Sequence, residues 1–474
     1  MIHRFNKTKI VATIGPASMN KQMLEKLIRA GADVCRINSS HGDHEMMKTI
    51  ITNVRELNDE LNTHVAILFD LQGPKLRIGD VEKGDFLLKE DSTIVFTNKE
   101  CIGNEEKVYI RYPDFHNDVE TGEKILIDDG KLELVITDII GEEVIARVTQ
   151  GGILSSRKGV NLPNTSISLP SLTEKDRIDL QFALDNNVEW IGLSFVRKPE
   201  DVQELKSIIS AAGKQCKVIA KIEKPEAVHN IDEIIRYSDG IMVARGDLGV
   251  ELPFEMVPAI QKTIVKKCNK MAKPVIIATQ MMESMITNFR PTRAEANDVG
   301  NAVFDGADAL MLSAETSVGK FPDGTVSAMQ KIISEVEQLN EIYYKENPPS
   351  NDNPHVSDSI CYTACTLARQ TGAVAIAAMT HSGGTAFKIS SHRPKANIFI
   401  FTDHKPLLCT LSLLWGVRVF YYDKYESTDV TISDVKKFMR DKHITKSGDF
   451  VIHVASTPLH ERTTANTIKL SLVE

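Results

Sequence analysis

The feature that most constrains the fold of this chain is an eightfold alternation of apolar, β-branched runs with amphipathic segments. Because the runs are apolar almost throughout, both of their faces should be covered, as in a parallel sheet flanked by helices. Between the runs, apolar residues recur at helical spacing, for example over residues 45–61 and 258–270. Eight strand–helix units predict a closed (β/α)8 barrel, although an open doubly wound sheet shows the same alternation. The eight runs begin at Thr8, Asp33, His64, Val188, Lys217, Asp239, Pro274 and Ala307.

The third unit is interrupted, which predicts three domains in an α/β chain. After Asp70, short alternating segments with acidic–Gly turns are typical of β-hairpins, so we expect an inserted all-β lid domain over residues 74–170. The barrel then occupies residues 1–73 and 171–345 and ends in a long helix over residues 323–343. A domain carried on a barrel loop can move as a lid over the strand ends.

A Pro/Asn-rich linker over residues 345–355 follows the barrel. Strand and helix patterns alternate again over residues 355–474, which predicts a smaller C-terminal α/β domain.

Composition excludes several classes of function. The net charge is −8 with both signs mixed along the chain, which argues against a nucleic-acid or an anionic-membrane partner. The seven cysteines form no CxxC pair, and this odd number indicates reduced thiols rather than a disulfide framework. The first residues lack the apolar region of a secretory signal, and no apolar run reaches membrane-spanning length. We therefore expect a cytoplasmic protein.

Seven successive runs end in polar side chains, at the position from which barrel enzymes take their catalytic groups. Any one of these side chains could be a solvated loop residue, but seven in succession fit a ring of converging groups better. In chain order they are Arg36, Asn38, Ser40 and His41; Asp70; Ser194; Lys221 and Glu223; Arg245 and Asp247; Thr279 and Gln280; Ser313 and Glu315.

The chemistry of these groups suits a metal and a phosphate. Glu223 and Asp247 end adjacent strands, so their carboxylates can share a Mg²⁺ ion that keeps sites for water and substrate. Lys221 points to the same strand face as Glu223 and could stabilise a transferring phosphoryl group or an enolate. The turn at residues 244–249 offers backbone N–H groups to an anion, and Arg36 offers a bidentate donor. The alternatives are a structural Lys221–Glu223 ion pair and a simple tight turn.

Long stretches carry a resemblance to a known family in the right order along the chain. They include KTKIVATIGPAS, CRINSSHGDHE, DLQGPKLRIG, AKIEKPEAV, MVARGDLGVELP and PTRAEANDVGNAVFDGADALMLSAETSVGKFP. Through them the sequence closely resembles the pyruvate kinases over essentially its whole length. The resemblance implies phosphoryl transfer from phosphoenolpyruvate to ADP, giving pyruvate and ATP in the last step of glycolysis. It also implies dependence on Mg²⁺, for which Mn²⁺ could substitute, and a homotetramer.

The resemblance assigns roles to positions of this sequence. Glu223 and Asp247 would bind the divalent ion, and Lys221 would neutralise first the phosphoryl group and then the enolate oxygen. A water relay near Thr279 and Ser313 would protonate the enolate carbon. The residues implied to contact phosphoenolpyruvate are Arg36, Lys221, Gly246, Asp247 and Thr279. Those implied to contact the nucleotide, which would bring a second Mg²⁺, are Pro16, Asn38, His41, Arg77 and Lys158.

One loop departs from the pattern of many members of the family. Their strand-three loop reads Asp-Thr-Lys-Gly-Pro-Glu, and its glutamate accompanies a K⁺ requirement. Here residues 70–75 read Asp-Leu-Gln-Gly-Pro-Lys, so Lys75 takes the glutamate's place. An ammonium there would supply the charge of K⁺ and repel a bound monovalent ion, which predicts that K⁺ is not required. The alternative is a solvated lid charge. The K⁺ ligands elsewhere would correspond to Asn38, Ser40, Asp70 and the Leu71 carbonyl.

A second candidate site lies in the C-terminal domain, where the family binds sugar-phosphate effectors. The small residues of the loop at 379–386 let backbone N–H groups approach a phosphate. The loop at residues 457–467 lacks the glycines seen where fructose 1,6-bisphosphate binds, and His381 stands where a lysine is often found. We therefore expect another phosphorylated effector or a weak response. The candidate effector loop comprises Thr380, His381, Ser382, Gly383, Gly384 and Thr385.

Two other functions compete with this interpretation. A Mg²⁺-dependent C–C lyase of the phosphoenolpyruvate/pyruvate barrel group also uses paired carboxylates and an enolate, but it does not explain the lid or the C-terminal domain. A non-enzymatic binding module would not need Lys221, Glu223 and Asp247, and all three are present.

Overall fold

The computed structural model describes residues 6–344, 348, 355–424, 427–458 and 463–474. Eight parallel strands form a closed barrel and follow one another around the ring in chain order. The predicted (β/α)8 barrel is therefore confirmed over the open sheet. Its strands are β1 (Lys9–Ile14), β2 (Val34–Asn38), β3 (Ala66–Asp70), β12 (Trp190–Leu193), β13 (Lys217–Ile222), β14 (Gly240–Ala244), β15 (Val275–Ala278) and β16 (Ala309–Leu312).

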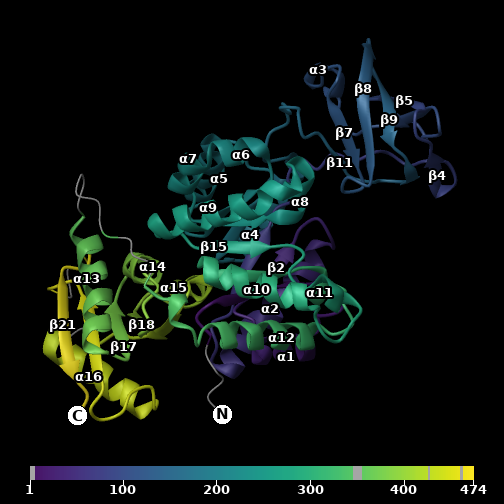
Figure 1. Ribbon diagram of the computed structural model, residues 1–474. Coiled ribbons are helices and arrows are strands. Elements are labelled where there is room, and N and C mark those ends of the chain that lie inside the picture. Colours follow the sequence, from purple (N-terminus) through teal and green to yellow (C-terminus); the bar gives the residue numbers. More distant parts are fainter. Residues whose placement is uncertain (1–5, 345–347, 349–354, 425–426, 459–462) are drawn as a thin grey trace.

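Helices surround the barrel and bury their apolar faces against it (Figure 1). In α2, the buried side chains Met47, Ile50, Val54 and Leu57 recur at helical spacing. None of the described helices combines the length and apolar character needed to cross a membrane. The helices are α1 (Lys21–Ala30), α2 (His44–Leu61), α4 (Glu174–Asp185), α5 (Pro199–Ala211), α6 (Pro225–His229), α7 (Ile231–Tyr237), α8 (Arg245–Glu251), α9 (Val257–Lys270), α10 (Arg293–Asp305), α11 (Ala314–Ser317) and α12 (Pro322–Val336).

The helix predicted over residues 323–343 is shorter than expected. It ends at Val336, and a separate 3-10 turn covers Asn340–Ile342. The carboxylate of Glu337 accepts hydrogen bonds from the backbone N–H groups of Lys7 and Thr8, at 2.9 and 2.7 Å. The chain leaves the helix where this side chain caps the start of the first strand.

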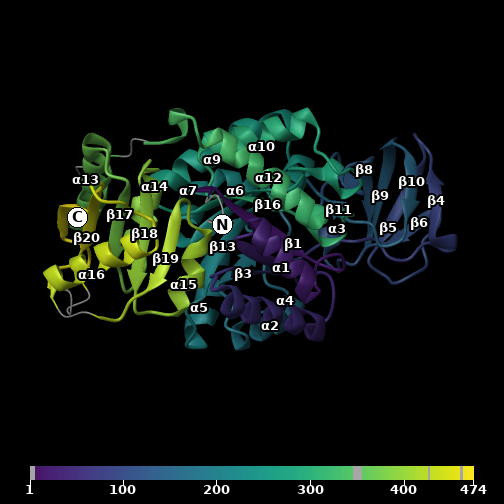
Figure 2. The same ribbon diagram turned by 90° about the horizontal axis from the view of Figure 1, so that it is seen from below.

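The insertion between β3 and α4 is built of strands with its own apolar core, as predicted for the lid. One sheet has the order β11-β7-β8-β9-β5-β6, and β4 pairs with β10 in a second sheet. Figures 1 and 2 place this domain on the opposite side of the barrel from the C-terminal domain. Its elements are β4 (Asp85–Leu88), β5 (Thr93–Thr97), β6 (Lys107–Tyr109), α3 (Phe115–Asp118), β7 (Lys124–Ile127), β8 (Leu132–Ile140), β9 (Glu143–Gln150), β10 (Gly152–Ser155) and β11 (Val160–Asn161).

The C-terminal domain has a five-stranded sheet of order β19-β18-β17-β20-β21, in which only the β20–β21 pair is antiparallel. The predicted linker at residues 345–355 falls mostly outside the described residues. The elements are α13 (Val356–Thr371), β17 (Ala375–Met379), α14 (Gly384–Ser391), β18 (Asn397–Thr402), α15 (Pro406–Thr410), β19 (Val417–Tyr421), α16 (Thr428–Asp441), β20 (Phe450–Ala455) and β21 (Thr467–Leu472).

Buried cations join this domain to the amino-terminal end of the barrel. Lys7 Nζ donates to the carbonyl oxygens of Lys395 and Ala396, at 2.9 Å each. Arg393 Nη2 donates to Asp308 Oδ2 at 2.8 Å. The carboxyl ends of the strands, where the candidate groups lie, are therefore left free of the C-terminal domain.

Candidate active site

Four charged side chains form one buried network at the carboxyl ends of β2, β3 and β13. Arg36 Nε donates to Asp70 Oδ2 at 2.8 Å. Lys221 Nζ lies 3.3 Å from Asp70 Oδ1 and 2.9 Å from Glu223 Oε1. None of the four is more than 9% exposed. Two cations and two carboxylates thus neutralise one another where an unpaired charge would be costly.

The network sets the protonation of its members. Burial alone would lower the pKa of Lys221, but the carboxylates of Asp70 and Glu223 outweigh burial and raise it to about 12. Burial likewise opposes ionisation of Asp70, yet Lys221 and Arg36 bring its pKa below the ordinary value. Burial raises the pKa of Glu223, and the negative charge of Asp247 adds to this rise although Lys221 opposes it. Glu223 and Asp247 therefore repel each other until a cation lies between them.

Ser194 and Thr13 complete the network. Lys221 Nζ donates to Ser194 Oγ at 2.7 Å, and this hydroxyl donates to the Leu71 carbonyl at 2.6 Å. The Lys221 ammonium thus lies among Ser194, Asp70 and Glu223, with a hydrogen bond to the first and ion pairs to the other two. Thr13 Oγ1, from β1, accepts from Arg36 Nη1 at 3.1 Å. From the sequence, Ser194 was predicted only as a polar residue at a strand end. Thr13 was not predicted, because a single hydroxyl within an apolar run does not indicate a site.

The donor set at Glu223 and Asp247 fits a hard divalent ion. Glu223 Oε2 accepts from the backbone N–H of Phe195 at 2.7 Å, which orients the carboxylate. No group of three or more His, Cys, Asp or Glu side chains able to hold a metal occurs among the described residues. Two carboxylates without sulfur or nitrogen ligands suit Mg²⁺, which keeps several positions for water and substrate, and disfavour zinc.

Thr279 and Gly246 meet where β14 and β15 end. The Gly246 N–H donates to Thr279 Oγ1 at 2.7 Å, so the hydroxyl lies beside the start of α8, which carries Asp247. A Cβ atom on Gly246 would lie 3.3 Å from this oxygen, which explains the glycine.

Ser313 and Glu315, after β16, differ from this pair. Glu315 is buried, and its two oxygens accept from the backbone N–H groups of Ser313 and Met282, at 2.7 and 3.2 Å. It therefore stabilises backbone, whereas the half-buried Ser313 keeps its hydroxyl at the strand end.

Of the residues predicted to contact a nucleotide, Arg77 and Lys158 lie together at the base of the lid, and His41 lies near Arg77. Burial lowers the pKa of His41, and the positive charges of Arg77, Lys75 and Arg36 lower it further, so these cations act on one region. Lys158 Nζ is paired with Asp128 Oδ1 at 2.8 Å.

Pro16 is exposed in the loop after β1. The neighbouring Ala17 N–H donates to the Ser317 carbonyl at 2.9 Å, which fixes this loop against α11.

Three of the oxygens predicted for a monovalent cation already accept hydrogen bonds within the protein: Asn38 Oδ1, Asp70 Oδ2 and the Leu71 carbonyl. Asn38 Oδ1 accepts from the Ser40 N–H at 3.1 Å. Asp70 and the Leu71 carbonyl are bonded as described above. The Lys75 side chain is exposed, and within the described part of the chain its ammonium makes no hydrogen bond to these oxygens. Any effect of Lys75 on these oxygens is therefore a longer-range electrostatic effect of its positive charge rather than a direct contact.

The candidate effector loop lies apart from this site. A cavity of about 240 Å³ in the C-terminal domain is lined by Thr380, His381, Ser382, Gly384 and Thr385, among others. Gly383 has φ +86° and precedes α14; its N–H donates to Thr380 Oγ1 at 3.0 Å. His381 Nδ1 is 2.8 Å from Asp403 Oδ1. Residues 459–462 of the later loop lie outside the described residues.

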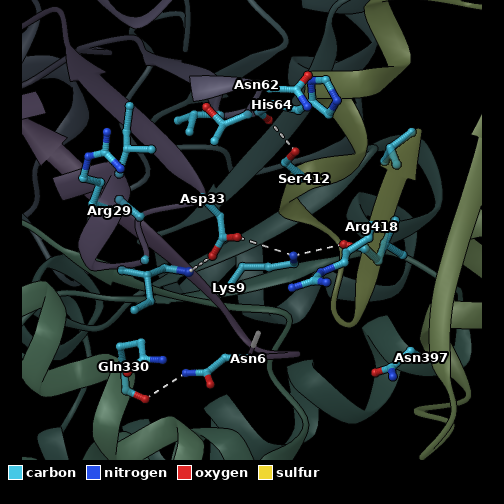
Figure 3. Close-up of a pocket in the computed structure, with 18 of the residues that line it drawn as sticks. Asn6, Lys9, Arg29, Asp33, Asn62, His64, Gln330, Asn397, Ser412 and Arg418 are labelled. Carbon is cyan, nitrogen blue, oxygen red and sulfur yellow. Dashed lines mark hydrogen bonds and ion pairs between the residues drawn. The ribbon is translucent and has the colours of Figure 1, made fainter. Parts of the chain in front are cut away.

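A cavity of about 1140 Å³, which the sequence did not predict, lies at the opposite end of the barrel (Figure 3). It opens between the amino ends of the first strands and the C-terminal domain, and none of the predicted site residues lines it. Inside it, Lys9 Nζ lies 3.4 Å from Asp33 Oδ1 and donates to the Val417 carbonyl at 3.1 Å. Only the docking of two domains creates this space, so no local sequence signal marks it.

Comparison with known proteins identifies the family to which this site belongs. A family model described as pyruvate kinase, barrel domain, matches residues 5–326, and a model described as pyruvate kinase, alpha/beta domain, matches residues 358–471. The chain belongs to the pyruvate kinase family. It is 43% identical to the pyruvate kinase of Clostridium acetobutylicum, over 99% of this chain and 100% of that protein. It is 42% identical to the pyruvate kinase of Mycobacterium tuberculosis, over 95% of each.

A solved structure agrees with the family assignment. The crystal structure of a pyruvate kinase from Cryptosporidium parvum superposes with a TM-score of 0.94 at 36% identity and covers 99% of this chain and 96% of that one. Membership of the pyruvate kinase family accounts for the barrel, the lid and the C-terminal domain together, and it does not favour the lyase alternative.

Proposed function

We propose that this chain transfers the phosphoryl group of phosphoenolpyruvate to ADP, giving pyruvate and ATP in the last step of glycolysis. The observation that carries the proposal is the buried Lys221 ammonium, held between Asp70 and Glu223 at the carboxyl ends of the barrel strands. A chain of the pyruvate kinase family with this intact network has the positioned positive charge that phosphoryl transfer needs.

Glu223 and Asp247 would hold Mg²⁺ or, in its place, Mn²⁺. When bound, the ion supplies positive charge to the phosphoryl oxygens and orients the substrate. Its charge would also relieve the repulsion that helps to raise the pKa of Glu223. The residues proposed to contact phosphoenolpyruvate are Arg36, Lys221, Gly246, Asp247 and Thr279.

Lys221 acts as a fixed charge rather than as an acid. With a pKa of about 12 it stays protonated at neutral pH and is a poor proton donor. A phosphoryl oxygen, and afterwards the enolate oxygen, can replace one of the oxygens that surround its ammonium group. The proton for the enolate carbon then reaches it through water held near Thr279 and Ser313.

ADP would bind where the lid meets the barrel, and its phosphates would bring a second Mg²⁺. The cations around His41 favour an anion in this region. Lys158 would exchange Asp128 for a nucleotide phosphate when the lid closes. The proposed nucleotide contacts are Pro16, Asn38, His41, Arg77 and Lys158.

We also propose that activity does not require K⁺. Lys75 adds positive charge close to Arg36 and Arg77, which weakens binding of a monovalent cation nearby. The Leu71 carbonyl accepts a hydrogen bond from the Ser194 hydroxyl, which leaves one lone pair rather than two for a cation. A Lys75→Glu variant should gain activation by K⁺, and a variant that stays indifferent to K⁺ would count against a role for Lys75.

The remaining proposals follow from the family resemblance. The loop from Thr380 to Thr385 would bind a phosphorylated effector other than fructose 1,6-bisphosphate, or would respond weakly. The enzyme would act as a homotetramer in the cytoplasm. Titration with sugar phosphates and nucleoside monophosphates, read as a change in KM for phosphoenolpyruvate, tests the effector proposal.

Phosphorus NMR of the reaction tests the function directly. With Mg²⁺, phosphoenolpyruvate and ADP, the phosphoenolpyruvate signal should disappear as the γ-phosphate signal of ATP grows. No ATP signal would refute kinase activity, and loss of phosphoenolpyruvate with growth of inorganic phosphate alone would mean that water, not ADP, accepts the phosphoryl group.

A further inference from the structure

The backbone at the end of β15 is strained, and two contacts hold it in place. Thr279 has φ +70° and Gln280 has φ +53°, a region that β-branched residues rarely enter. The Thr279 carbonyl accepts from Arg245 Nη2 at 2.9 Å, and its Oγ1 accepts from the Gly246 N–H at 2.7 Å. The strained residue is therefore tied at two points to the first residues of α8, which follows β14 directly.

The Arg245 guanidinium, which makes one of these contacts, is fixed by a residue that lies outside the candidate site. Asp298, on α10, accepts from Arg245 with both oxygens, at 2.8 Å from Nη1 and 2.7 Å from Nη2. Such a fork-to-fork pair fixes the plane of the guanidinium as well as its position. The Arg245 side chain is only 13% exposed, so solvent offers it little compensation if the carboxylate is lost.

We infer that Asp298 is a positioning residue for phosphoryl transfer, acting through Arg245 on Thr279. The inference rests on the proposed function, in which Thr279 orients the substrate and Asp247 binds the metal. Without the carboxylate, Arg245 loses the two bonds that fix its plane, and the Thr279 carbonyl loses an aligned donor. The strained backbone then relaxes and carries the Thr279 hydroxyl away from the reacting groups.

Two substitutions separate this role from a general loss of stability. Asp298→Ala should lower kcat by between about tenfold and about a hundredfold, the scale of a small misplacement of a substrate-orienting group. Asp298→Asn should lose less, because its amide oxygen still accepts one hydrogen bond. The KM for ADP should change by less than about twofold, because the proposed nucleotide contacts come from other loops.

Glu189→Gln is the matched control. It removes a carboxylate 2.8 Å from Arg55 at the amino end of β12, far from the candidate site. This variant should unfold at a lower urea concentration while keeping the wild-type kcat. If the Glu189 and Asp298 variants all lose kcat in proportion to their loss of stability, the positioning role is overturned.

A double-mutant cycle tests the route of the effect. In an Arg245→Ala background, Asp298→Ala should cause no further loss of kcat, because the group through which it acts is gone. Additive losses, or a wild-type kcat in Asp298→Ala itself, would overturn the inference and leave the proposed function intact. A wild-type chain that makes no ATP from phosphoenolpyruvate and ADP would overturn both.

Discussion

Replacing Lys221 with methionine removes the charge around which the candidate site is arranged. The methionine side chain has nearly the volume of the lysine side chain, but Asp70 and Glu223 lose the ammonium that lies 3.3 and 2.9 Å from them. The rise of the Lys221 pKa from 10.5 to about 12 corresponds to about 2 kcal/mol in favour of the folded chain. Because the folded pKa is the higher one, this contribution is fully present below pH 10.5 and is lost as the pH rises through about 12. The variant should therefore be less stable at neutral pH.

The effect on catalysis should be larger than the effect on stability. A positioned cation in phosphoryl transfer contributes at least about a thousandfold to kcat, or about 4 kcal/mol of barrier. We therefore expect Lys221→Met to stay folded by circular dichroism and to lose at least about a thousandfold in kcat in a lactate-dehydrogenase-coupled assay with Mg²⁺.

Lys9→Met is the matched control, because Lys9 is a buried lysine beside Asp33 at the opposite end of the barrel. It should lose stability with a kcat within about twofold of the wild type, since it lies far from the reacting groups. A Lys221→Met enzyme that keeps kcat within about tenfold of the wild type, or equal losses in both variants, would refute the role of Lys221.

Three further predictions concern the metal, the packing of the site and the C-terminal domain. Glu223→Gln should raise the Mg²⁺ concentration for half-maximal rate by at least about tenfold, and an unchanged Mg²⁺ titration would exclude Glu223 as a ligand. Gly192→Ala places a Cβ atom 2.7 Å from Asp70 Oδ1 and should destabilise the barrel by about 1–3 kcal/mol in urea unfolding; wild-type stability and kcat would show that Asp70 is not held there. Burial lowers the pKa values of His392 and His453 to about 4, so the unfolded chain binds more protons between about pH 4 and pH 6.5. Acidification across this window should cost up to about 3 kcal/mol per histidine, and His453→Leu should flatten the fall in stability measured by urea unfolding at a series of pH values; an equally steep fall in that variant would contradict the assignment.

The barrel was predictable because its signals are local. Strands buried on both faces need continuous apolar runs, and the helices between them carry apolar side chains at helical spacing and recognisable caps. The box at the start of α10, where Thr292 and Glu295 bond reciprocally, is one such cap. The helix expected to reach residue 343 ends at Val336, and the Glu337 side chain that follows bonds to the backbone of Lys7 and Thr8, a contact across more than 300 positions that no local pattern encodes.

The candidate site was predictable in its members but not in its contacts. The carboxyl ends of parallel strands meet at one edge, so Arg36, Lys221 and Glu223 were expected to converge. Asp70 was expected in the ring of converging groups and as a ligand of a monovalent cation, whereas it pairs with both Arg36 and Lys221. The pairing of Asp70 with these cations depends on the register between β2 and β3, in which Asn38 lies beside Asp70 and Arg36 lies beside Leu68. The strained Thr279 could not be foreseen either, since threonine normally avoids positive φ.

The initial rate of ADP-dependent pyruvate formation, with Mg²⁺ and either K⁺ or tetramethylammonium at equal ionic strength, is the most direct test of the central claim. We predict rapid turnover in both salts, with rates that agree within about twofold, because Lys75 already supplies positive charge near the strand-three loop. No turnover in either salt would contradict the kinase function. Turnover that K⁺ raises by about tenfold or more would contradict its independence of K⁺.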